Sequence, residues 1–380
     1  MSLIIDEHRQ YLVDRTRLNA FETAITSAVK PGDVVLDLAS GTGIMGLLAC
    51  RAGARRVYSI EVGGMISVAR EVARTNGFED RVTFIKGYSL HVDLPEKVDV
   101  VVADQIGNFG FNAGVIEYFA DARRRFLKPE GVTLPLKMSL MLAPIEAQDL
   151  FDQVEFWNSS PAGFDFCAVR GMAANTGYQV NLDPGSICGD AVTIANINLN
   201  YAETGTLHGE AIATINRAAV IHGLGGWFAA QLAAGVGMTN SPLSPDRVQR
   251  RQIFFPIERP VDVNKGDLVR VHITIRPVDM VVNWNVEIAD GVSGASKGRF
   301  RHSTWKGMLI TDEVRQLTQP EFKPKLIPRG EGRRTVCNLC DGTRTLKEIE
   351  DEVFRLHPEL FSTQEEAAVF VAEVVTRYTA

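Results

Sequence analysis

The sequence predicts an α/β doubly wound domain, then an all-β, barrel-like domain, then a small helical region. From Val34 onwards, short apolar runs alternate with helical patterns, and strands that alternate with helices form a parallel sheet covered on both faces. After Pro135, β-like runs follow one another with only turns between them. A stretch rich in proline and glycine then precedes two amphipathic helical patterns. We place the three domains at residues 1–135, 136–318 and 319–380.

The composition fits a soluble protein of several domains. The chain has 380 residues, which exceeds the usual span of one hydrophobic core. Its net charge of -6 argues against a general nucleic-acid or membrane-surface binder. No apolar run approaches the ~20 residues needed to cross a bilayer, and the first residues lack a signal-peptide pattern. Five scattered cysteines fit a reducing compartment. We therefore expect a cytoplasmic protein without nucleic-acid or membrane partners.

The individual elements are predicted by hydrophobic periodicity and by the residues that end each run. The first domain has predicted strands at 34–39, 56–62, 82–87 and 98–104, and predicted helices at 44–53, 67–77 and 116–127. The all-β domain has predicted strands at 139–146, 191–199, 209–215, 218–232, 251–258, 268–277 and 281–288. A predicted linker at 319–332 leads to predicted helices at 345–358 and 363–379.

A glycine-rich turn follows the first predicted strand. Gly41, Thr42 and Gly43 precede a helix, so a ligand can approach the backbone closely and meet the unpaired N–H groups of the helix terminus. The same residues satisfy the dinucleotide pattern G-x-G-x-x-G, so the turn alone does not identify the ligand. A tight strand-to-helix turn without any ligand is the other interpretation that remains open.

Two acidic residues favour a methyl donor at this turn. Asp37 places negative charge where the pyrophosphate of a dinucleotide would need positive charge, and it suits a ligand that carries an ammonium and a sulfonium. Glu61, at the end of the second predicted strand, can accept hydrogen bonds from both hydroxyls of a ribose. Together they indicate S-adenosylmethionine as the cofactor, in a Rossmann-like domain.

At these residues the chain resembles the protein arginine methyltransferases. Residues 34–62 and 85–104 match the first four strands of that family, and Asp14 to Arg17 match its N-terminal helix. The resemblance implies that Arg17 pairs with the methionine carboxylate of the donor, and that Ser89 and Leu90 contact its adenine. It also covers the all-β domain, where residues near 163–190 resemble the helical arm by which these enzymes dimerise. The resemblance thus implies a homodimeric methyltransferase.

The sequence differs from the family at the positions that should bind the acceptor. These enzymes grip a guanidinium with two glutamates that follow the fourth strand, and here the two positions hold Asp104 and Ala113. The family's Thr-His-Trp loop has also changed, with Val248 at the histidine position. Because losing one charged pair costs on the order of 2–5 kcal/mol, we do not expect arginine to be the preferred acceptor.

Asp104 is the best single candidate for a catalytic residue. It could orient the nucleophile or accept its proton, although it could equally be a carboxylate that caps the loop. Further hydrogen-bonding groups or bases could come from Gln105, Asn108, Asn112, His222 and His302. We expect no metal site.

The C-terminal region resembles the PqqD-like winged-helix domain, which recognises leader peptides in enzymes that modify ribosomally made peptides. The resemblance lies in a β-hairpin pattern, an Asp341–Gly342 turn, and a helix that Thr345 caps with Glu348 in a capping box. Such domains bind a leader peptide as an added strand. A docking module without a ligand remains the alternative. Cys337 and Cys340 are expected to be buried and structural.

The hypothesis from sequence is an S-adenosylmethionine-dependent methyltransferase that modifies a ribosomally synthesised precursor peptide held by its C-terminal domain. The alternatives are a protein arginine N-methyltransferase, a small-molecule methyltransferase, and a non-catalytic scaffold that keeps the cofactor fold.

Overall fold

The computed structural model describes residues 4–309, 316–317 and 321–378. They divide into two compact units, Met1–Met308 and Leu309–Ala380. The first unit therefore contains both the predicted α/β domain and the predicted all-β domain, and each unit is considered by itself.

A parallel sheet forms the α/β part, as predicted, and it has five strands where four were expected. Its order is β3-β2-β1-β4-β5, and every neighbouring pair is parallel. The strands are β1 (Val34–Leu38), β2 (Arg56–Glu61), β3 (Val82–Lys86), β4 (Val98–Val102) and β5 (Leu127–Leu134). The helices are α1 (Ile4–Val13), α2 (Arg15–Ala28), α3 (Ile44–Ala52), α4 (Met65–Thr75) and α5 (Val115–Arg125), with a 3₁₀ turn η1 (Ser89–His91). Every residue of β1 is buried, which fits a central strand covered on both faces.

Strand β5 corrects one expectation from sequence. Its residues were expected to form a turn because they include Pro129 and Gly131. In the structure β5 is the outer strand of the sheet and pairs with β4 across a register shift between Val98 and Val100. An outer strand needs its backbone donors on one side only, so it tolerates a proline.

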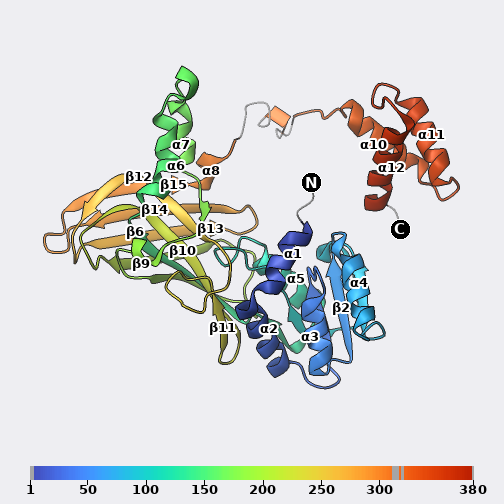
Figure 1. The fold of residues 1–380 in the computed structure, drawn as a ribbon, viewed down its shortest axis with the longest axis horizontal. Coiled ribbons are helices and arrows are strands. Elements are labelled where there is room, and N and C mark those ends of the chain that lie inside the picture. The colour runs from blue at the N-terminus through green and yellow to red at the C-terminus, as the bar shows by residue number, and fades with distance from the viewer. Residues whose placement is uncertain (1–3, 310–315, 318–320, 379–380) are drawn as a thin grey trace. The chain divides into compact units, whose positions relative to one another are not determined.

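The all-β part consists of two sheets that share the hydrophobic core of the first unit, as predicted for a barrel-like domain (Figure 1). One has the order β7-β12-β10-β6-β8 with β11 paired to β10, and the other has the order β15-β14-β13-β9. The strands are β6 (Lys137–Ile145), β7 (Tyr178–Val180), β8 (Val192–Asn198), β9 (Leu207–Thr214), β10 (Ala219–Ala233), β11 (Val236–Thr239), β12 (Gln252–Val263), β13 (Leu268–Arg276), β14 (Val281–Ala289) and β15 (Ser296–Ser303).

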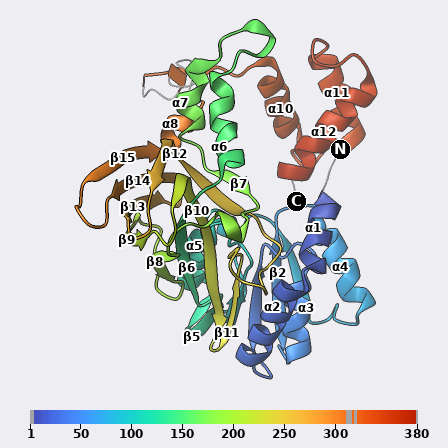
Figure 2. The same cartoon turned by 60° about the vertical axis from the view of Figure 1, so that its left-hand side comes forward.

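Close packing of β10 brings the barrel against the parallel sheet. A Cβ on Gly226 would lie 2.9 Å from the ring of Phe109, which belongs to the loop after β4. Helix α2 packs beside β10 and β11, and the two parts lie side by side in Figure 2. The loop after β4 is therefore held between the parallel sheet and the barrel.

A helical projection extends from the barrel sheets (Figure 1). It comprises α6 (Gln148–Glu155), η2 (Phe156–Asn158), η3 (Pro161–Gly163), η4 (Cys167–Val169) and α7 (Arg170–Ala173). Two further short elements are η5 (Pro184–Ser186) and α8 (Thr304–Gly307). Phe156 and Phe164 on the projection are 52% and 70% exposed. Apolar rings left in water suit a surface that another subunit covers, and dimerisation through this arm stays a prediction.

The second unit contains the helices α10 (Pro328–Leu339), α11 (Leu346–Leu356) and α12 (Gln364–Tyr378). Their buried residues include Val336, Ile349, Val353, Phe370 and Val371. Both predicted C-terminal helices are present, and the capping box of α11 has both of its hydrogen bonds. No helix among the described residues has the length and apolar character of a membrane span.

The expected β-hairpin before these helices is wrong. Its residues form α10 instead, which begins with Pro328 in its first turn and buries Val336 between the other two helices. The described residues of this unit include no strand, so the wing of a winged-helix domain is not found in them. The expectation for the cysteines is also wrong at Cys337, which is exposed; Cys340 is partly buried.

Candidate active site

A cavity of about 400 Å³ lies where the carboxyl ends of β1 and β4 meet α1, α2 and the barrel. Ligands of doubly wound sheets bind at this end of the strands. The lining residues are Glu7, His8, Gln10, Tyr11, Leu12, Arg17, Asp37, Leu38, Ala39, Ser40, Gly41, Thr42, Ile44, Met45, Asp104, Gln105, Gly107, Asn108, Ala113, Gln179, Gln249, Arg250 and Arg251. The structure thus brings five of the predicted site residues, Arg17, Asp37, Gly41, Thr42 and Asp104, to one cavity.

The glycine turn has no room for side chains. Gly41 and Gly43 have positive φ angles of 53° and 76°, which glycine adopts without strain. A Cβ on Gly41 would lie 2.5 Å from Cε1 of His8, because α1 lays this histidine over the turn. His8 was not singled out from the sequence, since nothing local links α1 to the turn. It forms part of the wall on the donor side.

Asp37 is the buried acid at the end of β1. It is 1% exposed, and one carboxylate oxygen accepts a hydrogen bond of 2.9 Å from the Gly46 N–H. Burial raises the pKa of Asp37 to about 7, and the negative charge of Glu61 adds to this shift. A cationic group in the cavity would be attracted to the ionised form and would lower this pKa.

Glu61 is anchored by the backbone. Its two carboxylate oxygens accept hydrogen bonds from the N–H groups of Gly41, at 2.9 Å, and Gly63, at 2.6 Å. Each oxygen has a further lone pair, so the carboxylate can still accept from the two hydroxyls of a ribose. The backbone contacts fix its orientation at the end of β2.

A second, smaller cavity of about 50 Å³ adjoins the ends of β1 and β2. Ser89 lines it, together with the aromatic rings of Tyr88 and Tyr118. Leu90, the other predicted adenine contact, does not line it and is 38% exposed. Burial, followed by the hydrogen bond with Tyr88, raises the pKa of Tyr118 to about 12, so its hydroxyl stays protonated near neutral pH. The two tyrosines were missed from the sequence.

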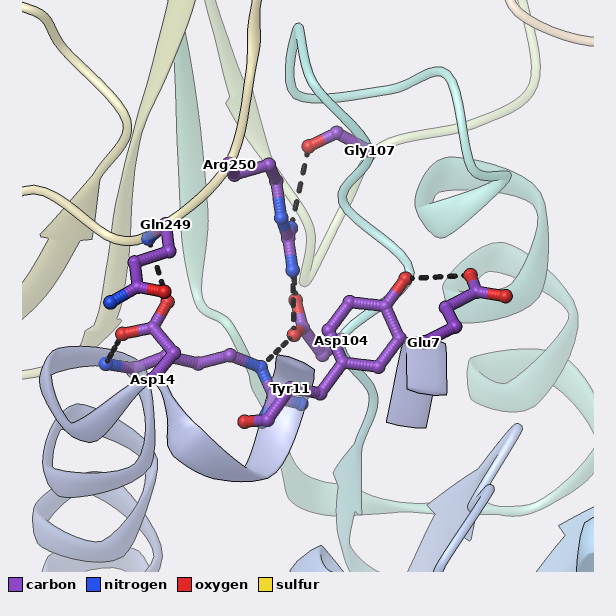
Figure 3. Close-up of polar contacts among 8 residues, drawn as sticks. Glu7, Tyr11, Asp14, Asp104, Gly107, Gln249 and Arg250 are labelled. Carbon is purple, nitrogen blue, oxygen red and sulfur yellow. Dashed lines mark hydrogen bonds and ion pairs between the residues drawn. The ribbon is translucent and has the colours of Figure 1, made fainter. Parts of the chain in front are cut away.

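Arg17 is buried at the start of α2. One of its Nη atoms donates to the carbonyl of Tyr11 at 3.1 Å, and its Nε donates to the carboxylate of Asp104. Asp14 caps α2 by accepting from the Arg17 N–H at 3.0 Å. The other carboxylate oxygen of Asp14 accepts from the Gln249 N–H at 2.7 Å. These contacts tie α2 to the loop before β12 (Figure 3).

Asp104 is held by two guanidinium groups. Besides Arg17, Arg250 binds it with N–O distances of 2.9 and 3.3 Å, and also donates to the carbonyl of Gly107 at 3.3 Å (Figure 3). Burial alone would raise the pKa of Asp104, but the charges and hydrogen bonds of Arg250 and Arg17 outweigh burial and lower it. A carboxylate paired in this way is a poor proton acceptor near neutral pH.

Arg250 is the principal site residue that the sequence did not reveal. It lies two positions after Val248, in the loop that replaces the family's Thr-His-Trp segment, and is 146 residues from its partner Asp104. An arginine in a changed loop was the available signal. Only the fold shows that this guanidinium reaches the carboxylate of the acceptor loop.

The rest of the acceptor loop offers few charged groups. Ala113 lines the cavity at the position of the second expected glutamate, and Gln105 and Asn108 line it as well. Asn112 is directed to its own loop instead, where its side-chain oxygen accepts from the N–H groups of Asn108 and Phe109 at 2.9 and 3.0 Å. The loop is thus shaped by its own hydrogen bonds and contributes one carboxylate.

Neither candidate histidine lines the cavity. His222 is bonded to Gln148 and to the backbone of Ala147, at 2.8 and 3.2 Å. His302 stacks on Trp284 with ring centroids 5.1 Å apart. Both are packing residues of the barrel. Among the residues that the structure describes, no group of three or more His, Cys, Asp or Glu side chains could hold a metal ion.

Comparison with known proteins identifies both parts of the first unit. Residues 16–136 match the family model of ribosomal protein L11 methyltransferase (PrmA). Residues 137–288 match the arginine methyltransferase oligomerization subdomain. Protein arginine N-methyltransferase 1 of Chlamydomonas reinhardtii is 28% identical over 279 residues, covering 71% of this chain and 80% of that protein. Its counterpart from Oryza sativa subsp. indica is 37% identical over 170 residues, 44% of each chain.

Two solved structures show the same fold. Protein arginine methyltransferase 10 of Arabidopsis thaliana superposes with a TM-score of 0.68 at 23% identity, covering 78% of this chain and 97% of that one. The Trypanosoma brucei PRMT1 enzyme-prozyme heterotetrameric complex with AdoHcy gives a TM-score of 0.70 at 21% identity, with the same coverage.

The comparisons support arginine N-methylation better than modification of a precursor peptide, which none of them supports. They do not support the resemblance to PqqD-like domains either. What they establish is the reaction type and its cofactor. The chain is an S-adenosylmethionine-dependent methyltransferase, similar in fold to the protein arginine methyltransferases.

Proposed function

We propose that the 400 Å³ cavity is the active site and that the enzyme methylates a side chain of a protein or peptide there. One observation carries this proposal: the same cavity is lined by the glycine turn with Asp37 and by the acceptor loop with Asp104. A methyl donor and an acceptor bound in one cavity react as if at very high local concentration.

The donor half of the proposed site has the charges that S-adenosylmethionine requires. Asp37 would face the ammonium and Arg17 the carboxylate of the methionine part, since guanidinium groups bind carboxylates well. Gly41, Thr42 and Gly43 would let the donor approach the backbone, and Glu61 would bind the ribose. Ser89 and the small cavity beside it would receive the adenine, with Leu90 at most at its edge. The donor supplies a methyl group that its positive sulfur activates.

The acceptor half is where this chain departs from its relatives. Proteins named protein arginine N-methyltransferases are similar over most of the chain, so arginine in a protein is the acceptor that the comparisons favour. The residues of the site do not favour it: Ala113 offers no carboxylate, and Asp104 is already paired with Arg250. We propose that Asp104 acts by positioning Arg250 and Arg17 and not by accepting a proton.

A role for the second unit in peptide capture stays a prediction. The helices of this unit present no strand edge among their described residues, so strand addition of a leader peptide has no structural support. Assembly into a homodimer through the arm is proposed on two grounds: the exposed Phe156 and Phe164, and the match to an oligomerization subdomain. Light scattering of the purified chain, compared with a Phe164→Ser variant, tests this assembly. A variant that remains as large as the unchanged protein would exclude Phe164 from the interface.

Calorimetry on the full chain tests the proposed site directly. S-adenosylmethionine and its demethylated product should bind, whereas NAD should not. Asp37→Ala should weaken binding of both donor forms, and Asp33→Ala is the matched control because Asp33 lies before β1 and does not line the cavity. Equal affinities of the two variants would show that the donor binds elsewhere. Transfer of labelled methyl groups to an arginine-rich protein, with methylarginine as the product, would establish the arginine alternative.

A further inference from the structure

We propose that the acceptor of this methyltransferase is a carboxylate, which the enzyme methylates on oxygen to form a methyl ester. This inference rests on the proposed function, because it names the chemistry of the acceptor at the same cavity. It follows from the charges of the acceptor half and from the state of Asp104.

The guanidinium site of the acceptor loop is already filled from within the chain. Arg250 binds both oxygens of Asp104, as a substrate arginine would have to do, and a third bond to Gly107 holds it there. Both side chains are nearly buried, with exposures of 11% and 8%. An incoming arginine would have to displace Arg250 and leave that guanidinium without a partner, which buried cations strongly resist.

Among the described residues, one arginine of the cavity lining has no carboxylate partner. Three arginines, Arg17, Arg250 and Arg251, line the cavity together with three acids, Glu7, Asp37 and Asp104. Arg251 is exposed and forms no ion pair within the part of the chain that the structure describes. Of the other lining acids, Asp37 lies on the donor side and Glu7 is an exposed residue that accepts a hydrogen bond from the Tyr11 hydroxyl at 3.0 Å.

These charges balance when a donor and an anionic acceptor are both present. The positive groups are then the three arginines and the ammonium and sulfonium of the donor, and the negative groups are Glu7, Asp37, Asp104, the donor carboxylate and the acceptor. The carboxylate of the donor would neutralise Arg17, and Asp104 neutralises Arg250. Arg251 is then the cation left for the acceptor. Its guanidinium can bind both oxygens of a carboxylate, whereas it would repel a substrate arginine or lysine.

The transfer needs no base when the nucleophile is a carboxylate. An oxygen lone pair of the ionised acceptor forms the new O–CH₃ bond while the C–S⁺ bond breaks, and the sulfur keeps the electron pair of that bond. No proton moves, and the anion and the sulfonium yield a neutral ester and a neutral thioether. This matches a site whose acceptor-side acid is held ionised by two guanidinium groups and so cannot take a proton.

Two blocked amino acids test the acceptor class independently of peptide sequence. Ligand-observed NMR would measure binding of N-acetylglutamate amide and N-acetylarginine amide to the full chain saturated with the demethylated donor. We expect the glutamate probe to bind at least about tenfold more tightly. Equal or tighter binding of the arginine probe, or no saturable response to the glutamate probe, would overturn the proposal. Binding of the donor itself is measured first by calorimetry, so failure of the proposed function is seen separately.

Variants of Arg251 and a chemical assay complete the test. Arg251→Gln should weaken binding of the glutamate probe severalfold and Arg251→Lys should largely restore it. Arg247→Gln should have no effect, because Arg247 is an exposed arginine of the same loop that does not line the cavity. With labelled donor, polyglutamate should acquire label that mild alkali releases as methanol. Alkali-stable label in polyarginine, with none in polyglutamate, would refute ester formation.

Discussion

In the cluster of Arg17, Asp104 and Arg250, loss of the carboxylate should destabilise the protein more than loss of one guanidinium. The cluster contains two guanidinium groups and one carboxylate, with side-chain exposures of 8%, 8% and 11% in that order. Asp104→Asn leaves two buried cations without a counter-charge, and removing one partner of a buried pair costs ~3–5 kcal/mol. Arg250→Met instead leaves the balanced pair of Arg17 and Asp104. It should cost less, ~1–3 kcal/mol, because Asp104 keeps Arg17 as its counter-charge and only the hydrogen bonds from Arg250 to Asp104 and Gly107 are lost.

The double variant tests whether this reasoning is correct. With Asn at position 104 only one guanidinium is unpaired once Arg250 is replaced by Met, so the double variant should be more stable than Asp104→Asn alone by ~1–2 kcal/mol. Urea unfolding followed by tryptophan fluorescence measures this. All four tryptophans, at positions 157, 227, 284 and 305, lie in the first unit, so the signal reports only on that unit. A cost for Arg250→Met as large as that for Asp104→Asn would refute the charge count.

The stability that this cluster contributes should also depend on pH, in the direction that the pKa of Asp104 sets. The folded-state pKa of Asp104 is lowered, so the carboxylate contributes stability above its unfolded pKa of about 3.9 and loses it as the pH falls through the folded value. The stability advantage of the unchanged protein over Asp104→Asn should therefore shrink below about pH 4. An advantage that is constant with pH would show that Asp104 is not ionised in the folded protein.

Three further changes probe the donor site and the second unit. Because burial raises the pKa of Asp37 to about 7, the affinity for the donor should rise as the pH increases towards 7. Binding should then release a proton, which calorimetry in two buffers of different ionisation enthalpy detects. Asp37→Asn should abolish this proton release. Gly41→Ala should weaken donor binding at least tenfold, since its Cβ would lie 2.5 Å from His8, and Gly64→Ala, whose Cβ meets nothing within 4 Å, is the control. Thr345→Ala should destabilise α11 by ~1 kcal/mol in thermal unfolding, and Thr345→Ser should not, because serine keeps the cap.

Much of the fold could be predicted because its signals are local. Four strands of the parallel sheet, from β1 to β4, appear in the sequence as apolar runs that end at turns, and β1 and β4 end at the acids of the site. Strand β5 was missed because Pro129 and Gly131 resemble a turn when its pairing with β4 is unknown. The hairpin assigned to residues of α10 failed for a similar reason, since only packing against α11 and α12 shows that Val336 belongs to a helix.

In the site, too, residues of one segment could be predicted from the sequence, whereas contacts between distant segments could not. Asp37, Gly41 and Gly43 belong to one strand–turn–helix segment, so the sequence brings them together without any knowledge of tertiary contacts. The partners of Asp104 come from α2 and from the loop before β12, and His8 reaches Gly41 from α1. No spacing in the sequence connects these segments. The sequence could show that the second glutamate was missing, but not that an arginine had taken the place of the substrate.

This division also explains how one half of the site can change while the other half stays. The centre of the donor half is one strand–turn–helix segment, in which Asp37 accepts from the Gly46 N–H, and Glu61 at the end of β2 fixes the turn by accepting from the Gly41 N–H. The acceptor half is assembled from loops that meet only through side chains. A substitution in the loop before β12 can therefore reverse the charge presented to the acceptor without disturbing the donor. Arg250 changes the charge of the acceptor half in this way, because it neutralises the Asp104 carboxylate that would otherwise attract a cation. The charge left to bind the acceptor is then the positive charge of Arg251.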